Sequence, residues 1–164
     1  MRTMRNSIYL PMAAVLLTAA LAGPAAAGEF VPFSGTLQAQ EKSAPGPLPG
    51  TILSDGTGGG IATHLGRFTL TWKFTVNLAD GTGSGTVHYI AANGDDIFIT
   101  AVGKAVPASQ PGFFLITESE TITGGTGRFA NAQGSFTVVR LLDFNAGSSS
   151  GSFLGIITSP GSAK

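Results

Sequence analysis

The segment from Arg67 to Val76 alternates strictly between two kinds of residue. Every second side chain is large and apolar, and those between them are threonine or basic. Side chains of a β-strand point alternately to opposite faces, so this pattern predicts a strand with one buried face and one polar face. Beyond residue 27, no long window repeats apolar residues at the three- and four-residue spacing of a helix. The chain must therefore bury its apolar strand faces against one another.

Similar alternation predicts about eight strands, near 30–40, 59–65, 67–77, 84–92, 96–105, 112–123, 134–144 and 150–158. Short connections such as Asp80-Gly81 and Asn93-Gly94 tolerate positive φ and are typical of hairpins between antiparallel neighbours. The Pro- and Gly-rich stretch 41–58 is the exception and is predicted to be a mobile loop. The fold class is therefore all-β, as a closed barrel or a sandwich.

The first 27 residues have the three-part layout of a secretory signal peptide. Two arginines precede an apolar run from Ile8 to Leu21, and three alanines end the segment. The run is short for a membrane helix, which needs roughly 20 apolar residues. We expect a helical signal peptide over 1–27, cleavage after Ala27, export to the periplasm or the medium, and a single domain over 28–164. An uncleaved N-terminal anchor is the alternative.

Charge and cysteine content exclude several classes of function. Residues 28–164 hold seven basic and nine acidic residues, and the basic ones are spread singly along the chain. Nucleic-acid binding needs clustered positive charge, so we expect no nucleic-acid partner. The chain has no cysteine, which excludes disulfides and thiolate metal sites. Its two histidines, His64 and His88, lack a short metal-ligand spacing. We predict no metal, no cofactor and no membrane span after cleavage.

The most distinctive segment is 122–134, with the sequence ITGGTGRFANAQG. It resembles the Gly-Gly-Thr-Gly-Lys/Arg-Phe-x-x-Ala-x-Gly stretch of plant dirigent proteins and the related allene oxide cyclase-like barrels, where an apolar strand also follows. Together with the sequence ATHLGRFT at 62–69, it is also similar to a group of small exported bacterial proteins of unassigned activity. The resemblance implies an eight-stranded antiparallel β-barrel, often trimeric, with an apolar cavity. It carries over no catalytic residue.

We expect the residues of this segment to have structural roles. Gly124, Gly125, Gly127 and Gly134 would allow a tight turn with positive φ. Phe129 would fold back as a plug at one end of the barrel.

A few residues are candidates for a ligand site in the barrel interior. Glu118 and Glu120 share a strand face with apolar residues, and so does Arg140. If these faces point inward, the charges form either a structural ion pair or a site that orients a ligand. The opposite faces are also apolar enough to face inward, so both arrangements stay open. Trp72 and His64 complete the predicted interior set, although His64 also fits a hydrogen-bonded structural histidine.

The absence of a convincing catalytic constellation favours a non-enzymatic exported barrel that binds a small apolar or amphipathic molecule. An envelope or interaction protein that acts through its surface is a further hypothesis, and so is a cyclase-like or dirigent-like enzyme that guides a reactive intermediate with Glu118, Glu120 or Arg140. An interior cavity of roughly 300 Å³ or more with convergent polar groups would favour binding or catalysis. A filled core would favour a structural role. Both a monomer and a homo-oligomer are compatible with the sequence.

Overall fold

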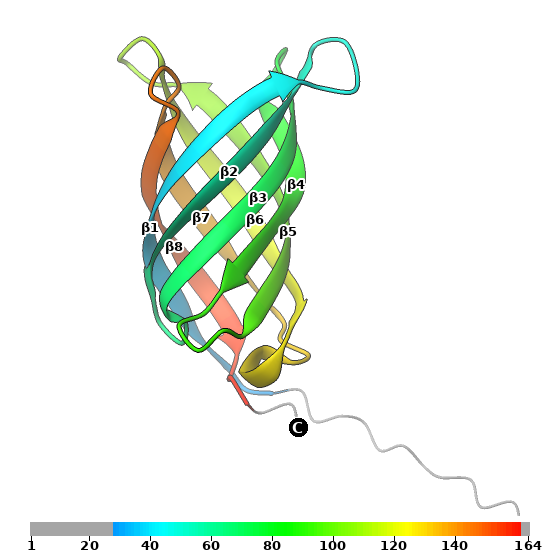
Figure 1. Cartoon of the computed structure of the whole chain (residues 1–164), viewed down its shortest axis with the longest axis vertical. Coiled ribbons are helices and arrows are strands. Elements are labelled where there is room, and N and C mark those ends of the chain that lie inside the picture. Colours follow the sequence, from blue (N-terminus) through cyan, green and yellow to red (C-terminus); the bar gives the residue numbers. More distant parts are fainter. Residues whose placement is uncertain (1–27, 162–164) are drawn as a thin grey trace, which may run out of the picture.

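The computed structural model describes residues 28–161, which form a closed barrel of eight strands in sequence order (Figure 1). Each strand pairs antiparallel with its sequence neighbours, and the first also pairs with the last. The elements are β1 (Phe30–Pro45), β2 (Thr51–Ala62), β3 (Gly66–Asn77), β4 (Thr82–Ile90), β5 (Asp96–Pro107), β6 (Phe113–Gly125), the 3-10 helix η1 (Gly127–Phe129), β7 (Gly134–Asp143) and β8 (Ser148–Thr158). The predicted all-β class and the eight-stranded antiparallel barrel are confirmed. The predicted signal peptide lies outside the described residues.

The predicted mobile loop over 41–58 is wrong. Residues 41–45 belong to β1 and residues 51–58 to β2, which leaves only 46–50 as a turn. The two strands are in register through this region, where Lys42 lies opposite Asp55. The barrel therefore has two long, steeply tilted strands where the sequence predicted a connection (Figure 1).

The glycines of β2 were interpreted as a sign of a mobile loop, but they make room for atoms of the neighbouring strands. Gly56 lies opposite Trp72 in the register, and a Cβ at Gly56 would overlap the indole ring. Gly35 on β1 is similar, because a Cβ there would lie 2.7 Å from the ring of Phe153. Small residues beside large ones are a common way to fill a narrow barrel. The composition of β2 thus reflects packing and not flexibility.

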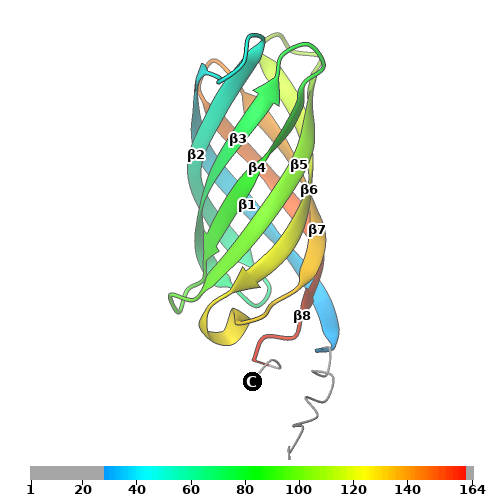
Figure 2. The ribbon, with the colours of Figure 1, turned by 90° about the vertical axis from the view of Figure 1, so that its right-hand side faces the viewer.

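The two ends of the barrel differ. The turns 46–50, 78–81, 108–112 and 144–147 gather at one end, here called the cavity end. The turns 63–65 and 91–95, the segment 126–133 and both ends of the described chain gather at the other, here called the η1 end (Figures 1 and 2). Residues 28–161 contain no helix with the length and apolar character to cross a membrane.

The η1 end is closed by the segment that carries the sequence motif. Phe129 is 1% exposed and belongs to the main hydrophobic core. Gly127 has φ 52°, and a Cβ there would overlap the carboxylate of Asp95, so only glycine suits this position. Arg128 fastens η1 from outside, because its guanidinium donates to the backbone oxygen of His64 at 2.6 Å and its amide to Asp95 at 2.9 Å.

An aromatic cluster fills the half of the barrel next to η1. Its ring centroids lie 5.1 to 6.1 Å apart, in tilted and edge-to-face pairs. Such geometry adds a favourable quadrupole interaction to the burial of apolar area. The members are Phe33, Phe68, Tyr89, Phe136 and Phe153. This half is a packed core.

We expect Phe129→Ala to lower the free energy of unfolding by about 3–5 kcal/mol, because it empties a buried aromatic site. Urea denaturation of the variant and the parent protein measures the difference. Leu154→Ala, at a position 69% exposed, is the control and should change stability by less than about 0.5 kcal/mol. A loss below about 1 kcal/mol for Phe129→Ala would mean that Phe129 does not act as a plug.

Candidate functional site

A buried arginine lies at the middle of the barrel interior. Arg140 on β7 is 7% exposed and forms a two-pronged ion pair with Glu118 on β6, through Nε to Oε2 at 3.2 Å and Nη2 to Oε1 at 3.1 Å. Its Nη1 donates to Glu41 on β1 at 3.3 Å and to Ser149 on β8 at 3.1 Å. Paired hydrogen bonds of this kind are among the strongest that carboxylates make. Acceptors from three other strands thus hold the guanidinium.

Two further side chains, from β2 and β3, contact this cluster. Ser54 donates its hydroxyl to Glu41 Oε2 at 3.3 Å and accepts from Trp72 Nε1 at 3.4 Å. The indole ring also lies 5.1 Å from the guanidinium carbon of Arg140, within range of a cation–π interaction. Trp72 therefore supports the charged cluster both by hydrogen bonding and by stacking.

The alternation of each strand decides which side chains enter this cluster. On β7, Arg140 shares the inward face with Phe136, Val138 and Leu142, all of which are buried. On β6, Glu118 and Glu120 are 5% and 3% exposed and alternate with outward residues. Of the two arrangements that the sequence left open, the structure has the one with all three charged groups inside.

Glu120 lies deeper, one step along β6 towards the η1 end. Its Oε2 is buried without a hydrogen-bond partner among residues 28–161. Burial, and then repulsion from Glu118, raise the pKa of Glu120 well above its usual range, against the opposing effect of Arg140. Burial together with these two carboxyls also raises the pKa of Tyr89. A void of about 20 Å³ lies beside Glu120 and Tyr89, enough room for one water molecule.

The charge balance in the interior is unequal. Burial opposes the charge of Arg140, but Glu118 and Glu41 outweigh it and raise the pKa of the guanidinium. Glu118 uses both of its oxygens on Arg140, whereas Glu41 uses only Oε2, and its Oε1 is buried without a donor from the part of the chain that the structure describes. Three carboxyl groups therefore surround a single cation.

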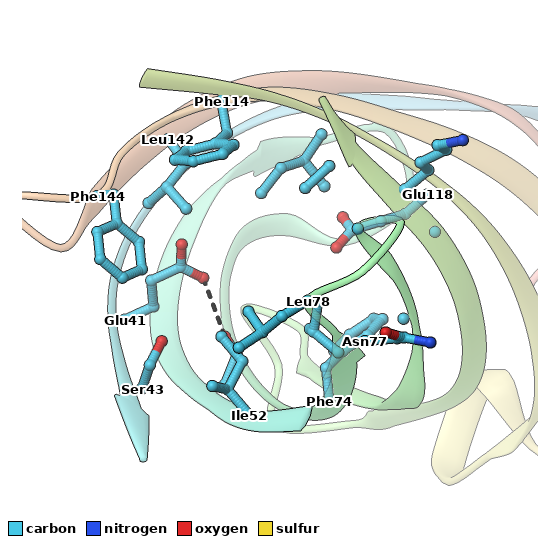
Figure 3. Close-up of a pocket in the computed structure, with 18 of the residues that line it drawn as sticks. Glu41, Ser43, Ile52, Phe74, Asn77, Leu78, Phe114, Glu118, Leu142 and Phe144 are labelled. Atoms are coloured by element: carbon cyan, nitrogen blue, oxygen red, sulfur yellow. Dashed lines mark hydrogen bonds between the residues drawn. The ribbon is translucent and has the colours of Figure 1, made fainter. Parts of the chain in front are cut away.

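A cavity of about 170 Å³ opens above the cluster at the cavity end (Figure 3). Glu41, Glu118 and Arg140 form its polar floor. Figure 3 shows Glu41 and Glu118 approaching the cavity from different sides, with apolar side chains around them. The apolar walls include Ile52, Phe74, Leu78, Phe114, Leu142 and Phe144. The arrangement suits a molecule with an apolar body and a polar group at one end.

The predicted interior residues divide into three groups. Glu118 and Arg140 line the cavity, whereas Glu120 and Trp72 lie below it around the small void. His64 is not in the interior, and that prediction is wrong. It occupies the β2–β3 turn with φ 64°, is exposed, and places Nε2 3.1 Å from the backbone oxygen of Pro32. A turn residue at positive φ cannot continue the inward face of a strand.

Glu41 and Ser54 are functional candidates that the sequence analysis missed, because both fell within the predicted loop. A signal was present, since Phe33, Leu37 and Ala39 place odd-numbered residues of β1 inside, and the same alternation reaches Glu41. Among residues 28–161, no group of three or more acidic or histidine side chains could hold a metal ion. His88 pairs instead with Asp96 at 2.7 Å on the outer surface.

Comparison with known proteins identifies the fold but no family. No protein-family model and no curated protein matches the chain. A solved structure, that of the pterocarpan synthase dirigent protein GePTS1, superposes with a TM-score of 0.60 and 15% sequence identity, over 93% of this chain and 98% of that chain. The chain has a dirigent-like barrel fold. The resemblance noted in segment 122–134 is thus confirmed for the architecture, and at this identity it concerns the fold alone.

In this dirigent-like barrel, Arg140 is the residue on which the interior charges depend. We expect Arg140→Met to lower the free energy of unfolding by about 3–5 kcal/mol, because it leaves two buried carboxylates uncompensated. Adding Glu118→Met should recover part of the loss, since it removes one of those carboxylates. Urea denaturation of the single and double variants measures this. A double variant less stable than Arg140→Met would contradict the pairing.

The raised pKa of Glu120 predicts a stability that falls with pH. The unfolded chain loses this proton near pH 4.5 while the folded barrel keeps it, so the folded state binds more protons as the pH rises towards the raised pKa. Glu120→Gln keeps the shape and removes the titration. Its stability relative to the parent should grow above pH 4.5, by at most about 1.4 kcal/mol per pH unit.

Urea denaturation between pH 4.5 and 8 tests this, with Glu29→Gln at an exposed position as the matched control. A stability difference for Glu120→Gln that does not change with pH would show that Glu120 ionises in the barrel as it does in the unfolded chain.

Proposed function

We propose that this barrel is an exported binding protein that holds one small amphipathic molecule in the cavity at the cavity end. The observation that carries the proposal is the combination of apolar walls and a charged floor in one opening. Glu41, one of the residues that line this opening, has an Oε1 that is buried without a donor from the described residues. A buried acceptor of this kind is costly unless a donor reaches it. Export rests on the signal peptide that the sequence predicts for residues 1–27.

The size of the cavity limits the ligand. At about 170 Å³, the volume does not reach the roughly 300 Å³ that we set as the mark of binding or catalysis, which is the size expected for a drug-sized ligand. The proposal therefore concerns a smaller ligand. It is close to that of an apolar cavity of about 150 Å³ that is known to bind benzene. The ligand is therefore a molecule of about one ring, or its aliphatic equivalent, with a single polar group.

The rest of the interior supports a single site. Towards η1, the aromatic cluster and Phe129 fill the barrel, and the void there is only about 20 Å³. A ligand therefore enters from the cavity end and stops at the charged floor. Phe144, which is 52% exposed, lies at the mouth of this path.

Guided chemistry on a bound intermediate is a second candidate function. The observation in its favour is that Glu118 and Arg140 bring opposite charges to the floor of an apolar cavity. Such groups could steer developing charge in a bound molecule by electrostatic stabilisation. The solved structure with the same fold is named a synthase, which describes that protein. Binding is the step that both candidates share, and it is the step to test first.

Partly filling the cavity should weaken binding. Toluene, benzyl alcohol and benzylamine, added to the isotopically labelled protein and followed by NMR, are probes of the right size. We expect at least one to bind, and Ile116→Phe, which enlarges a side chain of the cavity wall, to weaken that binding at least tenfold. Leu115→Phe is the matched control, because this neighbour on β6 faces outward. Absence of binding by all three probes would overturn the proposal.

A further inference from the structure

We infer that the cavity selects a cation, and that Glu41 Oε1 receives an ammonium group carried on a small apolar body. The inference rests on the proposed function and names the chemical class of its ligand. It starts from one atom: Oε1 of Glu41 is buried, borders the cavity through its residue, and has no hydrogen-bond donor within the described chain.

Glu41 is built into the site and is not a mobile surface group. Its side chain is 6% exposed, and its Oε2 is held by Arg140 and Ser54, each at 3.3 Å. The backbone amide of Glu41 donates to the oxygen of Gly147 at 2.7 Å, which fixes this part of β1 at the cavity end. Because Oε2 is committed, Oε1 is the oxygen left for a ligand.

The balance of charge decides which donor fits. Glu118 matches the charge of Arg140 with a two-pronged pair, so the negative charge of Glu41 is the one that lacks a full partner. Even with Glu120 protonated, two carboxylates face one guanidinium. A neutral hydroxyl would satisfy Oε1 but leave the charge unbalanced, and a carboxylate ligand would add a like charge. An ammonium group satisfies both requirements.

Other groups at the opening agree with a cationic ligand. Lys104 is a cation that also borders the cavity, but its side chain is exposed to solvent. After the hydrogen bonds from Thr82, its charge contributes to the lowered pKa of Asp80 on the surface. Ser43, two residues beyond Glu41 on β1, brings a hydroxyl that can accept a second of the three ammonium hydrogens. Phe114 and Phe144, with centroids 6.1 Å apart, offer aromatic faces to an apolar body and to a cation.

The test compares probes of matched shape on the parent protein. Benzylamine and benzyl alcohol have the same number of heavy atoms, and benzoate carries the opposite charge. At pH 7 we expect benzylamine to bind at least tenfold more tightly than benzyl alcohol by calorimetry or NMR titration, and benzoate not to bind. This comparison needs no variant, so it does not depend on how a substitution folds.

Variants then locate the selectivity. Glu41→Gln keeps the size of the side chain and removes its charge, so the preference for benzylamine over benzyl alcohol should fall below about twofold. Asp55→Asn makes the same charge change on the outer face of β2 and should leave the preference intact. Selectivity that survives in Glu41→Gln, or is lost in Asp55→Asn, overturns the role of Glu41.

The outcomes also separate this inference from the proposed function. If benzyl alcohol binds as tightly as benzylamine, the cavity binds small molecules but does not select a cation, and only the further inference fails. If neither these probes nor toluene bind, both fail.

Discussion

The buried charge of Arg140 is the constraint on which the rest of the interior depends. A guanidinium inside a narrow barrel is tolerated only if hydrogen-bond acceptors from several strands converge on it. Glu118, Glu41 and Ser149 supply these contacts directly, and the guanidinium lies over the indole ring of Trp72. This cluster divides the barrel into a filled half towards η1 and an open half towards the cavity end. In the proposed function, this cluster is the floor of the ligand site, and the packed half offers no second site.

The two halves use different means of stability. Towards η1, aromatic rings and the motif segment close the barrel, where Gly127 has a positive φ and Phe129 is buried. Towards the cavity end, the turns are joined mainly by strand pairing, and apolar side chains line an opening. The motif segment therefore belongs to the closed half of the barrel and lies away from the cavity.

Much of the fold could be predicted from alternation, and the candidate site only in part. Strand β3 was readable because its two faces differ sharply, whereas both faces of β6 and β7 are apolar enough to be buried, so the location of Glu118 and Arg140 stayed open. The first part of β2, residues 51–58, was hidden because Gly56 makes room for the indole of Trp72 on the neighbouring strand β3, a contact between strands that no local pattern records. Glu41 was lost with it, although it lies on the inward face that earlier residues of β1 define.

The most direct test of this account uses the single tryptophan of the chain. Its indole N–H donates to Ser54, which donates to the same carboxylate of Glu41 that faces the cavity. In a nitrogen–proton correlation spectrum, the Trp72 side-chain signal should move progressively and saturably as benzylamine is added, because a ligand on Glu41 redistributes this chain of hydrogen bonds. A Trp72 signal that stays fixed while benzylamine saturates signals elsewhere on the barrel would contradict a ligand site above the charged cluster.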